Sequence, residues 1–399
     1  MTAILTHQML PEKQVRITGI GQSAVGRPAT RTALQLTTDA CLAAIADAGL
    51  RPEEIDGLCT YPGKSPDGGG IAPVGSTEAM VALGLAPTWV SASTEGHAHM
   101  GAIFQAIMAI ASGLCRHVLI FRTVAQATAR AQSRSSTLLG RQGNRTSGNN
   151  AWTVPFHAHS PTNLWALYAQ AYFAKYGATE RQLGAIAVNA RRMAAHNPNA
   201  IYRDPITIDD YLASRVISSP LRLYDCDTHI DGATALVLSH RDAARDLANP
   251  PLAIEAMGMA VSKLGMGIHE GDFTTLPAER AGAMLWSRTD LAPGDVDVAQ
   301  IYDGFSILTL LWLEAVGLCR RGEAAAFVEG GSRIALDGEL PLNTSGGQLS
   351  AGRFHGYGHI HEACVQLWGR GGGRQVRDAG VSLVTNGGYG YGALLLRRD

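Results

Sequence analysis

The segment "LRPEEIDGLCTY" at residues 50–61 returns as "LAPGDVDVAQIY" at residues 291–302, 241 positions later. Each copy begins with a proline-led turn and continues as an apolar stretch, which is typical of a turn that leads into a buried strand. The helix-like stretches that precede them, residues 30–50 and 278–290, correspond as well. Repeated strand and helix units in one chain predict a duplicated α/β fold.

The two copies also end alike. Residues 231–242, "DGATALVLSHRD", and residues 389–399, "YGYGALLLRRD", each pass from a small-residue turn to an apolar strand and a charged end. We therefore predict an N-terminal half over residues 1–245 and a C-terminal half over residues 250–399. Residues 122–222 lengthen the first half, and we expect them to form an inserted loop domain that covers the ligand cleft.

The composition is that of a compact α/β enzyme, with 46% hydrophobic residues, 17% charged residues and 46 glycines among 399 residues. A formal net charge of −1 with scattered lysines and arginines argues against a nucleic-acid-binding surface. Six cysteines without a CxxC pair favour reduced thiols in the cytoplasm and no structural metal. No apolar stretch reaches the roughly 18 residues of a membrane span, so we expect a soluble, untargeted protein.

One strand-turn-helix corner stands out at residues 90–113, "VSASTEGHAHMGAIFQAIMAIASG". A strand that turns sharply into a helix points several backbone N–H groups at one place, where many folds hold a nucleophile or an anion. The turn contains neither cysteine nor aspartate. It contains Gly96, His97 and His99 instead.

The duplication, this corner and four further segments together resemble the thiolase superfamily, and more narrowly its sterol-carrier-protein or lipid-transfer branch. The four segments are "PLRLYDCDTHIDGATALVL" (220–238), "YDGFSILTLLWLEAVGLC" (302–319), "LPLNTSGGQLSAG" (340–352) and "GVSLVTNGGYGYGALLL" (380–396). The resemblance covers nearly the whole chain. It implies a five-layered αβαβα fold, an acyl-coenzyme A (acyl-CoA) site between the halves and a homodimer.

The residues that carry thiolase chemistry are replaced in this sequence. The position of the acylated cysteine falls on Gly96, that of the second catalytic cysteine on Thr385, and that of the activating histidine on Arg353. Condensation and thiolysis both need an acyl-enzyme, so we do not expect a functional thiolase. The chain looks instead like the thiolase-like aldolases that trim steroid side chains by retro-aldol cleavage of β-hydroxyacyl-CoA thioesters.

Retro-aldol cleavage needs a base for the β-hydroxyl proton and a means to stabilise the thioester enolate. We predict that either Tyr302 or Tyr357 is the base and that the other tyrosine holds or protonates the enolate. His355 is the nearest candidate in sequence for lowering the pKa of the phenol, and His97 and His99 could assist from the helix turn.

Five glycines are expected to line the thioester site. Gly96 leaves room beside the helix N-terminus, where N–H groups can face the thioester oxygen. The others are Gly346, Gly347, Gly387 and Gly388, in the two C-terminal Gly-rich loops. We expect no cofactor other than coenzyme A as the carrier of the substrate, and no metal, although three His-x-His pairs at 97/99, 157/159 and 359/361 leave zinc as an alternative.

Plain structural roles remain open for several of these residues. Tyr302 could be a packed strand-end residue, because the repeat places Tyr61 at the equivalent position of the first half. Tyr357 could pack within a Gly loop, and Gly96 could serve only a turn. The stretch at residues 225–231, "DCDTHID", looks like a set of ligands, but we interpret it as a structural turn before a core strand.

Two other functions stay possible on the sequence alone. The chain could be a non-catalytic acyl-CoA-binding subunit, or an acyltransferase that uses Ser93 or Thr94 as its nucleophile. The resemblance to the aldolases also implies a small partner protein with a zinc-ribbon and an oligonucleotide/oligosaccharide-binding-like (OB-fold) domain. With such a partner we expect a heterotetramer of two large and two small chains.

Overall fold

The computed structural model describes residues 10–64, 69–92, 100–133, 150–158, 160–263, 271–388 and 390–398. Within these ranges, nine strands form one mixed sheet in the order β3-β2-β4-β7-β1-β8-β11-β10-β9. The strands are β1 (Val15–Gln22), β2 (Gly57–Thr60), β3 (Trp89–Ala92), β4 (His117–Ala125), β7 (Asp231–His240), β8 (Leu252–Val261), β9 (Val298–Gln300), β10 (Val381–Asn386) and β11 (Gly390–Arg398).

The sheet consists of two groups with the same topology. β1 and β8 pair over two positions only, where Arg16 faces Ala253 and Ile17 faces Leu252. On one side of this junction, β1 is antiparallel to β7, β7 is antiparallel to β4, and β4 is parallel to β2. On the other side, β8 is antiparallel to β11, β11 is antiparallel to β10, and β10 is parallel to β9. The repeat seen in the sequence thus corresponds to two similar sheets that meet at β1 and β8.

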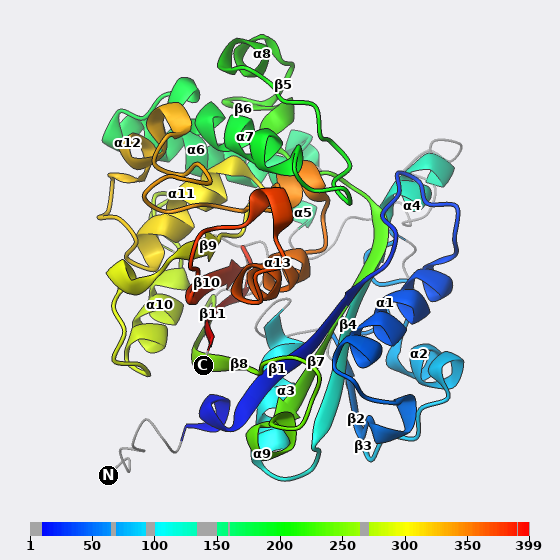
Figure 1. The fold of residues 1–399 in the computed structure, drawn as a ribbon. Helices are drawn as coiled ribbons and strands as arrows, with labels where there is room; N and C mark the ends of the chain where they lie inside the picture. Colours follow the sequence, from blue (N-terminus) through cyan, green and yellow to red (C-terminus); the bar gives the residue numbers. More distant parts are fainter. Residues whose placement is uncertain are drawn as a thin grey trace.

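Helices cover both sheets and fill the space between them (Figure 1). The central layer contains α3 (Gly101–Ala111) and α13 (Tyr357–Leu367), whose apolar residues form one core with strands of both groups. α1 (Ala33–Asp47) and α2 (Ser76–Leu83) lie outside the N-terminal strands. α10 (Ala278–Trp286) and α11 (Ser306–Ala315) lie outside the C-terminal strands. This is the predicted αβαβα arrangement, and the fold class is confirmed.

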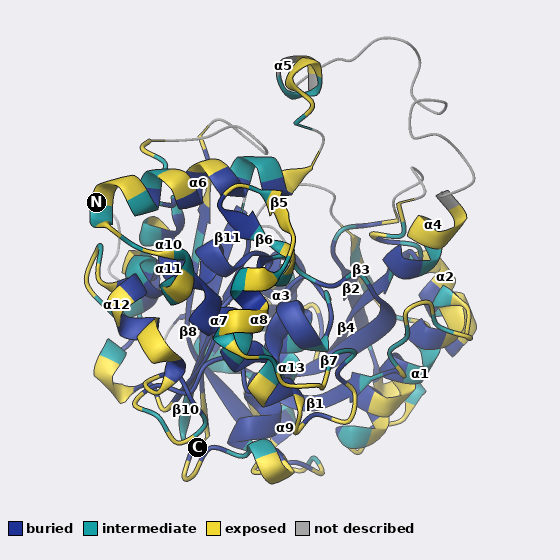
Figure 2. Ribbon diagram, turned by 90° about the horizontal axis from the view of Figure 1, so that it is seen from above, coloured by how far each residue is buried: buried dark blue, intermediate teal, exposed yellow. Residues whose placement is uncertain are grey.

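The pattern of burial follows these layers. α3 is apolar around nearly its whole circumference, as a helix between two sheets must be, and eight of its eleven residues are buried. α1 begins at a capping box of Thr32 and Gln35 and keeps an exposed outer face. In Figure 2 most strands of the large sheet are dark blue, whereas exposed residues gather on outer helices such as α1 and α12 (Ala324–Val328).

Only part of the segment between β4 and β7 packs on the C-terminal half. It contains α4 (Gln126–Ser133), α5 (Asn150–Thr153), α6 (Pro161–Tyr176), α7 (Glu180–Ala194), α8 (Ile208–Ala213) and the hairpin of β5 (Val216–Ser218) and β6 (Leu221–Arg222). α6 and α7 share a hydrophobic core with α11. β4 continues to Ala125, so the first residues of the expected insertion belong to the sheet. The domain limits given above remain a prediction. No helix among the described residues is both long and apolar enough to cross a membrane.

Candidate active site

Tyr302 follows the end of β9 in the turn "YDGF" that leads into α11. Its backbone N–H donates to Oγ1 of Thr385 on β10 at 2.9 Å, which fixes the start of the turn. A Cβ built at Gly304 would lie 3.2 Å from Oη of Tyr302, so the glycine leaves room for the phenol. The side chain is thereby held with only 8% of its surface exposed.

The surroundings of Tyr302 contain charges of both signs. Burial raises the pKa of its phenol, and the carboxylates of Asp227 and Asp303 raise this pKa further. The guanidinium of Arg353 and the amide of Gln348 lower the pKa, but burial outweighs them. Tyr302 is therefore a neutral phenol at neutral pH in the protein without ligand, and it has a proton to donate.

Tyr357 is the first residue of α13 and is completely buried. Its hydroxyl has no hydrogen-bond partner among the residues that the structure describes. Burial raises the pKa of this phenol, the thiol of Cys59 adds to the rise, and the charge of Arg122 opposes it. A buried hydroxyl without a partner is uncommon in proteins, which marks this position as a functional candidate.

His355 lies two residues before Tyr357 and is bracketed by two arginines. Nε of Arg353 donates to its Nε2 at 2.8 Å, and Nη2 of Arg122 lies 2.8 Å from its Nδ1. Its backbone has a φ of +53°, and Nδ2 of Asn386 donates to its carbonyl at 2.7 Å. The sequence predicts His355 as the nearest group that could lower the pKa of a phenol, and this remains a prediction; the charge that opposes the rise in the pKa of Tyr357 is that of Arg122.

A row of alternating arginines and histidines continues outward from this point. Nη1 of Arg353 lies 2.9 Å from Nε2 of His229 and pairs with Oδ1 of Asp227 at 3.2 Å. Nη1 of Arg130 lies 3.2 Å from Nδ1 of His229. Burial raises the pKa of Asp227 to about 6, against the effect of Arg353. Burial and the neighbouring arginines lower the pKa of His229 to about 4.

The sequence analysis missed Asp227, His229 and Arg122 as parts of this site. Asp227 and His229 belong to the stretch 225–231, whose ligand-like composition was interpreted as a structural turn. That stretch does lead into β7, but two of its side chains face Arg353. Arg122 carried a signal as well, because it is a charged residue inside an otherwise apolar strand, "HVLIFRTVA".

Two of the predicted glycines lie at the start of a short π-helical turn, η9 (Gly347–Ala351). Gly346 precedes this turn and Gly347 is its first residue. Both have positive φ, +97° and +59°. A Cβ at Gly347 would lie 1.9 Å from Oδ2 of Asp303. The carboxylate of Asp303 accepts a hydrogen bond from the backbone N–H of Gln348, at 2.9 Å to Oδ1 and 3.1 Å to Oδ2. Glycine is thus needed at position 347, because φ is positive and because a Cβ would collide with the carboxylate of Asp303.

The second predicted pair, Gly387 and Gly388, follows β10. Gly387 has a φ of +105°, and its carbonyl accepts a hydrogen bond from Nε1 of Trp312 at 2.9 Å. A Cβ at Gly388 would lie 2.6 Å from the ring of Trp165. The positive φ accounts for Gly387 and close packing accounts for Gly388, and a role of these glycines in binding the thioester remains a prediction.

The remaining predicted site residues, Gly96, His97 and His99, lie outside the described residues. The same holds for Ser93 and Thr94, the alternative nucleophiles. The described part of the chain resumes at Met100, just before α3.

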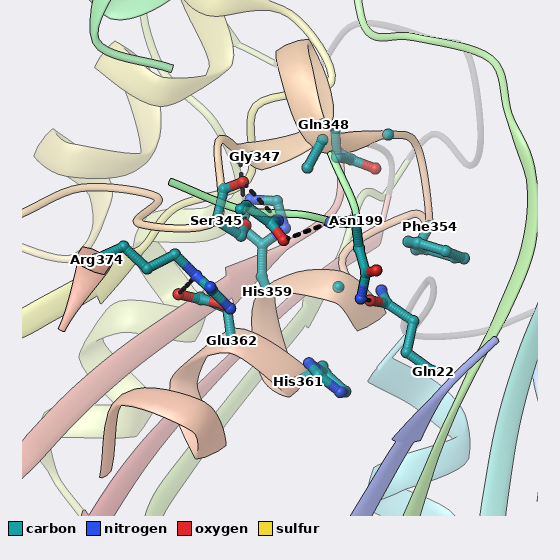
Figure 3. Close-up of a pocket in the computed structure, with 14 residues that line it drawn as sticks. Gln22, Asn199, Ser345, Gly347, Gln348, Phe354, His359, His361, Glu362 and Arg374 are labelled. Atoms are coloured by element: carbon teal, nitrogen blue, oxygen red, sulfur yellow. Dashed lines mark hydrogen bonds and ion pairs between the residues drawn. The ribbon is translucent and has the colours of Figure 1, made fainter. Parts of the chain in front are cut away.

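A hollow of about 50 Å³, partly open to solvent, lies near the start of α13, and neither Tyr302 nor Tyr357 is among its lining residues (Figure 3). Its lining comprises Gln22, Asn197, Asn199, Ser345, Gly347, Gln348, Ala351, Gly352, Phe354, Gly358, His359, His361, Glu362 and Arg374. Gln348 belongs to this wall and also lies beside the phenol of Tyr302. Nε2 of His359 faces the carbonyl of Ile301 at 3.0 Å and Oδ1 of Asp303 at 3.1 Å. No group of three or more potential metal ligands occurs among the described residues.

Comparison with known proteins identifies the family to which the chain belongs. The family described as Thiolase C-terminal domain-like matches residues 260–394. The 17-hydroxy-3-oxo-4-pregnene-20-carboxyl-CoA lyase of Mycobacterium tuberculosis is 35% identical over 365 residues, which cover 89% of this chain and 92% of that protein. The steroid side-chain-cleaving aldolase of Thermomonospora curvata is 36% identical over 398 residues, which cover 96% and 97% of the two chains.

A solved structure named Ltp2-ChsH2(DUF35) aldolase superposes with a TM-score of 0.86 at 33% identity, over 98% of this chain and 99% of that one. The chain therefore belongs to the thiolase superfamily, in the branch that contains the thiolase-like aldolases. The expected class of enzyme, a carbon–carbon lyase of the aldolase type, is confirmed by these relatives.

Proposed function

We propose that this protein is a retro-aldolase that acts on a β-hydroxyacyl-CoA thioester whose acyl part carries a steroid or a similar ring system. The products are a ketone or an aldehyde and a shorter acyl-CoA. One observation carries the proposal. Two buried tyrosines, Tyr302 and Tyr357, each lie near a guanidinium group, in a fold whose positions for the second catalytic cysteine and the activating histidine hold Thr385 and Arg353. The names of the relatives point to the same chemistry.

The proposed reaction moves one proton from oxygen to carbon. One tyrosine, as a phenolate, removes the proton of the β-hydroxyl. The O–H electron pair becomes the second bond of the new carbonyl group, the Cα–Cβ bond breaks, and its electron pair passes to the thioester as an enolate. The other tyrosine, a neutral phenol, protonates Cα of the enolate. Proton exchange between the two phenols and solvent then restores the starting state.

A covalent acyl-enzyme has little support at this site. Cys59 is the cysteine near Tyr357, and burial raises the pKa of its thiol to about 12. A thiol of that pKa is protonated at neutral pH and is a poor nucleophile. Proton transfer by the two phenols does not need one.

The test is an assay that follows carbonyl release from β-hydroxyacyl-CoA thioesters with cyclic side chains, together with intact-mass spectrometry of the protein. We expect a ketone or aldehyde, a shorter acyl-CoA and an unmodified protein. A protein that gains the mass of an acyl group would instead be an acyltransferase. A protein that binds the thioester without cleaving it would be the non-catalytic subunit.

We further propose a homodimer formed along β3, which is the last strand on the N-terminal side of the sheet. Val90 on β3 is 44% exposed, and Met108 and Leu114, on and just after α3, are 52% and 59% exposed. An open strand edge beside exposed apolar side chains is a surface that a second copy can cover. Light scattering after size exclusion would test it, and a monomer would contradict it.

A small zinc-ribbon and OB-fold partner would complete a heterotetramer. This part of the proposal is supported by the solved aldolase, whose name contains a second protein, ChsH2(DUF35). Co-purification with the product of a neighbouring gene is the direct test. A cytoplasmic location is also proposed, because the six cysteines are free rather than paired in disulfides.

A further inference from the structure

The guanidinium of Arg353 is held at two of its three nitrogen atoms. Nε donates to Nε2 of His355 at 2.8 Å, and Nη1 donates to Oδ1 of Asp227 at 3.2 Å. Nη1 also lies 2.9 Å from Nε2 of His229. Arginine has N–H donors and no acceptor, so each of these histidine nitrogens offers a lone pair to it. The three contacts fix both the position and the plane of the guanidinium.

The third nitrogen of Arg353, Nη2, has no hydrogen-bond partner in the part of the chain that the structure describes. The side chain is 20% exposed, so a ligand can reach the guanidinium from outside the protein. An arginine whose other donors are already engaged presents its remaining N–H groups in a fixed direction. Donors held in advance in this way are what stabilises an oxygen that gains negative charge during a reaction.

Short contacts place Arg353 close to the phenol of Tyr302. The backbone N–H of Arg353 donates to the carbonyl of Thr228 at 3.0 Å, and its side chain pairs with Asp227, the preceding residue. The backbone N–H of Asp227 donates to the carbonyl of Gly304 at 3.2 Å. A Cβ built at Gly304 would lie 3.2 Å from Oη of Tyr302. The guanidinium and the phenol are therefore neighbours of the same short segment.

The charges around Arg353 also suit an anion. Nη2 of Arg122 lies 2.8 Å from Nδ1 of His355, so one imidazole ring separates two guanidinium groups. Arg122 is 1% exposed, and no carboxylate among the described residues forms an ion pair with it. Asp227 offsets the charge of Arg353 only. A negative oxygen bound to Arg353 would be attracted by both cations, and burial makes this attraction stronger than it is in water.

Building on the proposed function, we propose that Arg353 is a catalytic residue that binds the thioester oxygen of the substrate through Nη2. When the Cα–Cβ bond breaks, its electron pair passes to the thioester, and this oxygen gains the negative charge of the enolate. Arg353 stabilises that charge, and Tyr302 and Tyr357 are left to move the proton. The assignment goes beyond the activity itself, because the retro-aldol reaction alone does not decide which group holds the enolate.

The first test removes one oxygen atom from the ligand. Acetyl-CoA and the thioether S-ethyl-CoA differ in the thioester oxygen, so the ratio of their dissociation constants, measured by calorimetry, reports on that atom. We expect the wild type to bind acetyl-CoA about tenfold more tightly, as for a hydrogen bond from a charged group. The preference should vanish in Arg353→Met and be intermediate in Arg353→Lys, whose ammonium cannot replace the fork. Equal affinities in the wild type, or an unchanged ratio in Arg353→Met, overturn the inference.

The second test is steady-state cleavage of a β-hydroxyacyl-CoA thioester. In Arg353→Met we expect kcat to fall about 10²- to 10³-fold. KM should rise by about tenfold at most, because the contact strengthens as the charge develops. Arg353→Ala should regain part of its kcat when guanidinium ion is added, but not when uncharged urea is added. Wild-type kcat in Arg353→Met would overturn the inference. So would a loss that guanidinium does not restore in a variant with a lowered melting temperature, because that result assigns a structural role.

Arg288→Met is the matched control. Arg288 is also largely buried, and it pairs with Glu12 at 2.5 and 2.7 Å. We expect Arg288→Met to lower stability without changing the ratio of dissociation constants or kcat. If the preference for the thioester depends on Arg353 while no β-hydroxyacyl thioester is cleaved, the inference stands and the proposed function fails. If cleavage occurs and the preference does not depend on Arg353, the reverse holds. If neither ligand binds, both fail.

Discussion

Replacement of Tyr357 by phenylalanine should separate stability from activity. The hydroxyl of Tyr357 is buried and makes no hydrogen bond with a described residue. Its removal therefore breaks no hydrogen bond, and it relieves the desolvation cost of an unpaired polar group, about 1–3 kcal/mol. We expect Tyr357→Phe to have the same free energy of unfolding as the wild type or a higher one. Loss of a base or an acid should at the same time reduce kcat by about 10²- to 10⁴-fold.

Tyr211→Phe is the matched control, since it should have the opposite effects. The hydroxyl of Tyr211 donates to Oδ2 of Asp225 at 2.8 Å, and both residues are fully buried. Loss of a hydrogen bond to a charged group typically costs about 1.5–3 kcal/mol, so this variant should be less stable and still active. Urea denaturation and thioester cleavage would be measured on both variants. Near-wild-type cleavage by Tyr357→Phe would remove this residue from the mechanism, and a large loss of stability would show that its hydroxyl has a structural partner.

Three further predictions concern other parts of the molecule. Gly304→Ala places a Cβ 3.0 Å from the Tyr302 ring, so the phenol must shift by a few tenths of an ångström; we expect about a tenfold fall in kcat with a melting temperature close to that of the wild type. His229 has a folded pKa near 4, below the usual 6.5, so its contribution to stability is complete above pH 6.5 and is lost as the pH falls to 4; urea denaturation should show a smaller loss over this range in His229→Gln. Val90→Glu places a charge on the open edge of β3 and should yield a monomer by light scattering; an unchanged dimer would move the interface elsewhere.

The fold could be predicted because its main features are local and repeated. The copies at residues 50–61 and 291–302 both become a 3₁₀ turn followed by a strand, η3 (Pro52–Glu54) with β2 and η7 (Pro293–Asp295) with β9. The apolar helix after the corner at residues 90–113 becomes α3 of the central layer. Periodicity determines such elements, and a topology shared by two halves follows from their order along the chain.

The site was harder to predict because its contacts join residues that are distant in the sequence. Tyr302 and Tyr357 were chosen because they sit in loops that resemble thiolase motifs, but their charged neighbours come from other elements. Arg122 on β4 reaches His355 across 233 positions of the sequence. Arg353 likewise reaches Asp227 across 126 positions. Sequence spacing cannot show such pairs, although a lone arginine in an apolar strand identifies a buried charge that needs an explanation.

The balance of charge in the site explains why two phenols can replace a thiol. A thiolase forms its intermediate on sulfur, whereas the aldol cleavage proposed here creates a negative charge that exists only until carbon is protonated. Of the two central guanidinium groups, Arg353 is paired with Asp227, and Arg122 has no counter-charge among the described residues. Among the described residues, Arg122 is thus a buried cation without a carboxylate partner, and the fold holds it in place. In the proposed reaction a phenolate or enolate that forms nearby is attracted to this cation, and the buried surroundings make this attraction stronger than it would be in water.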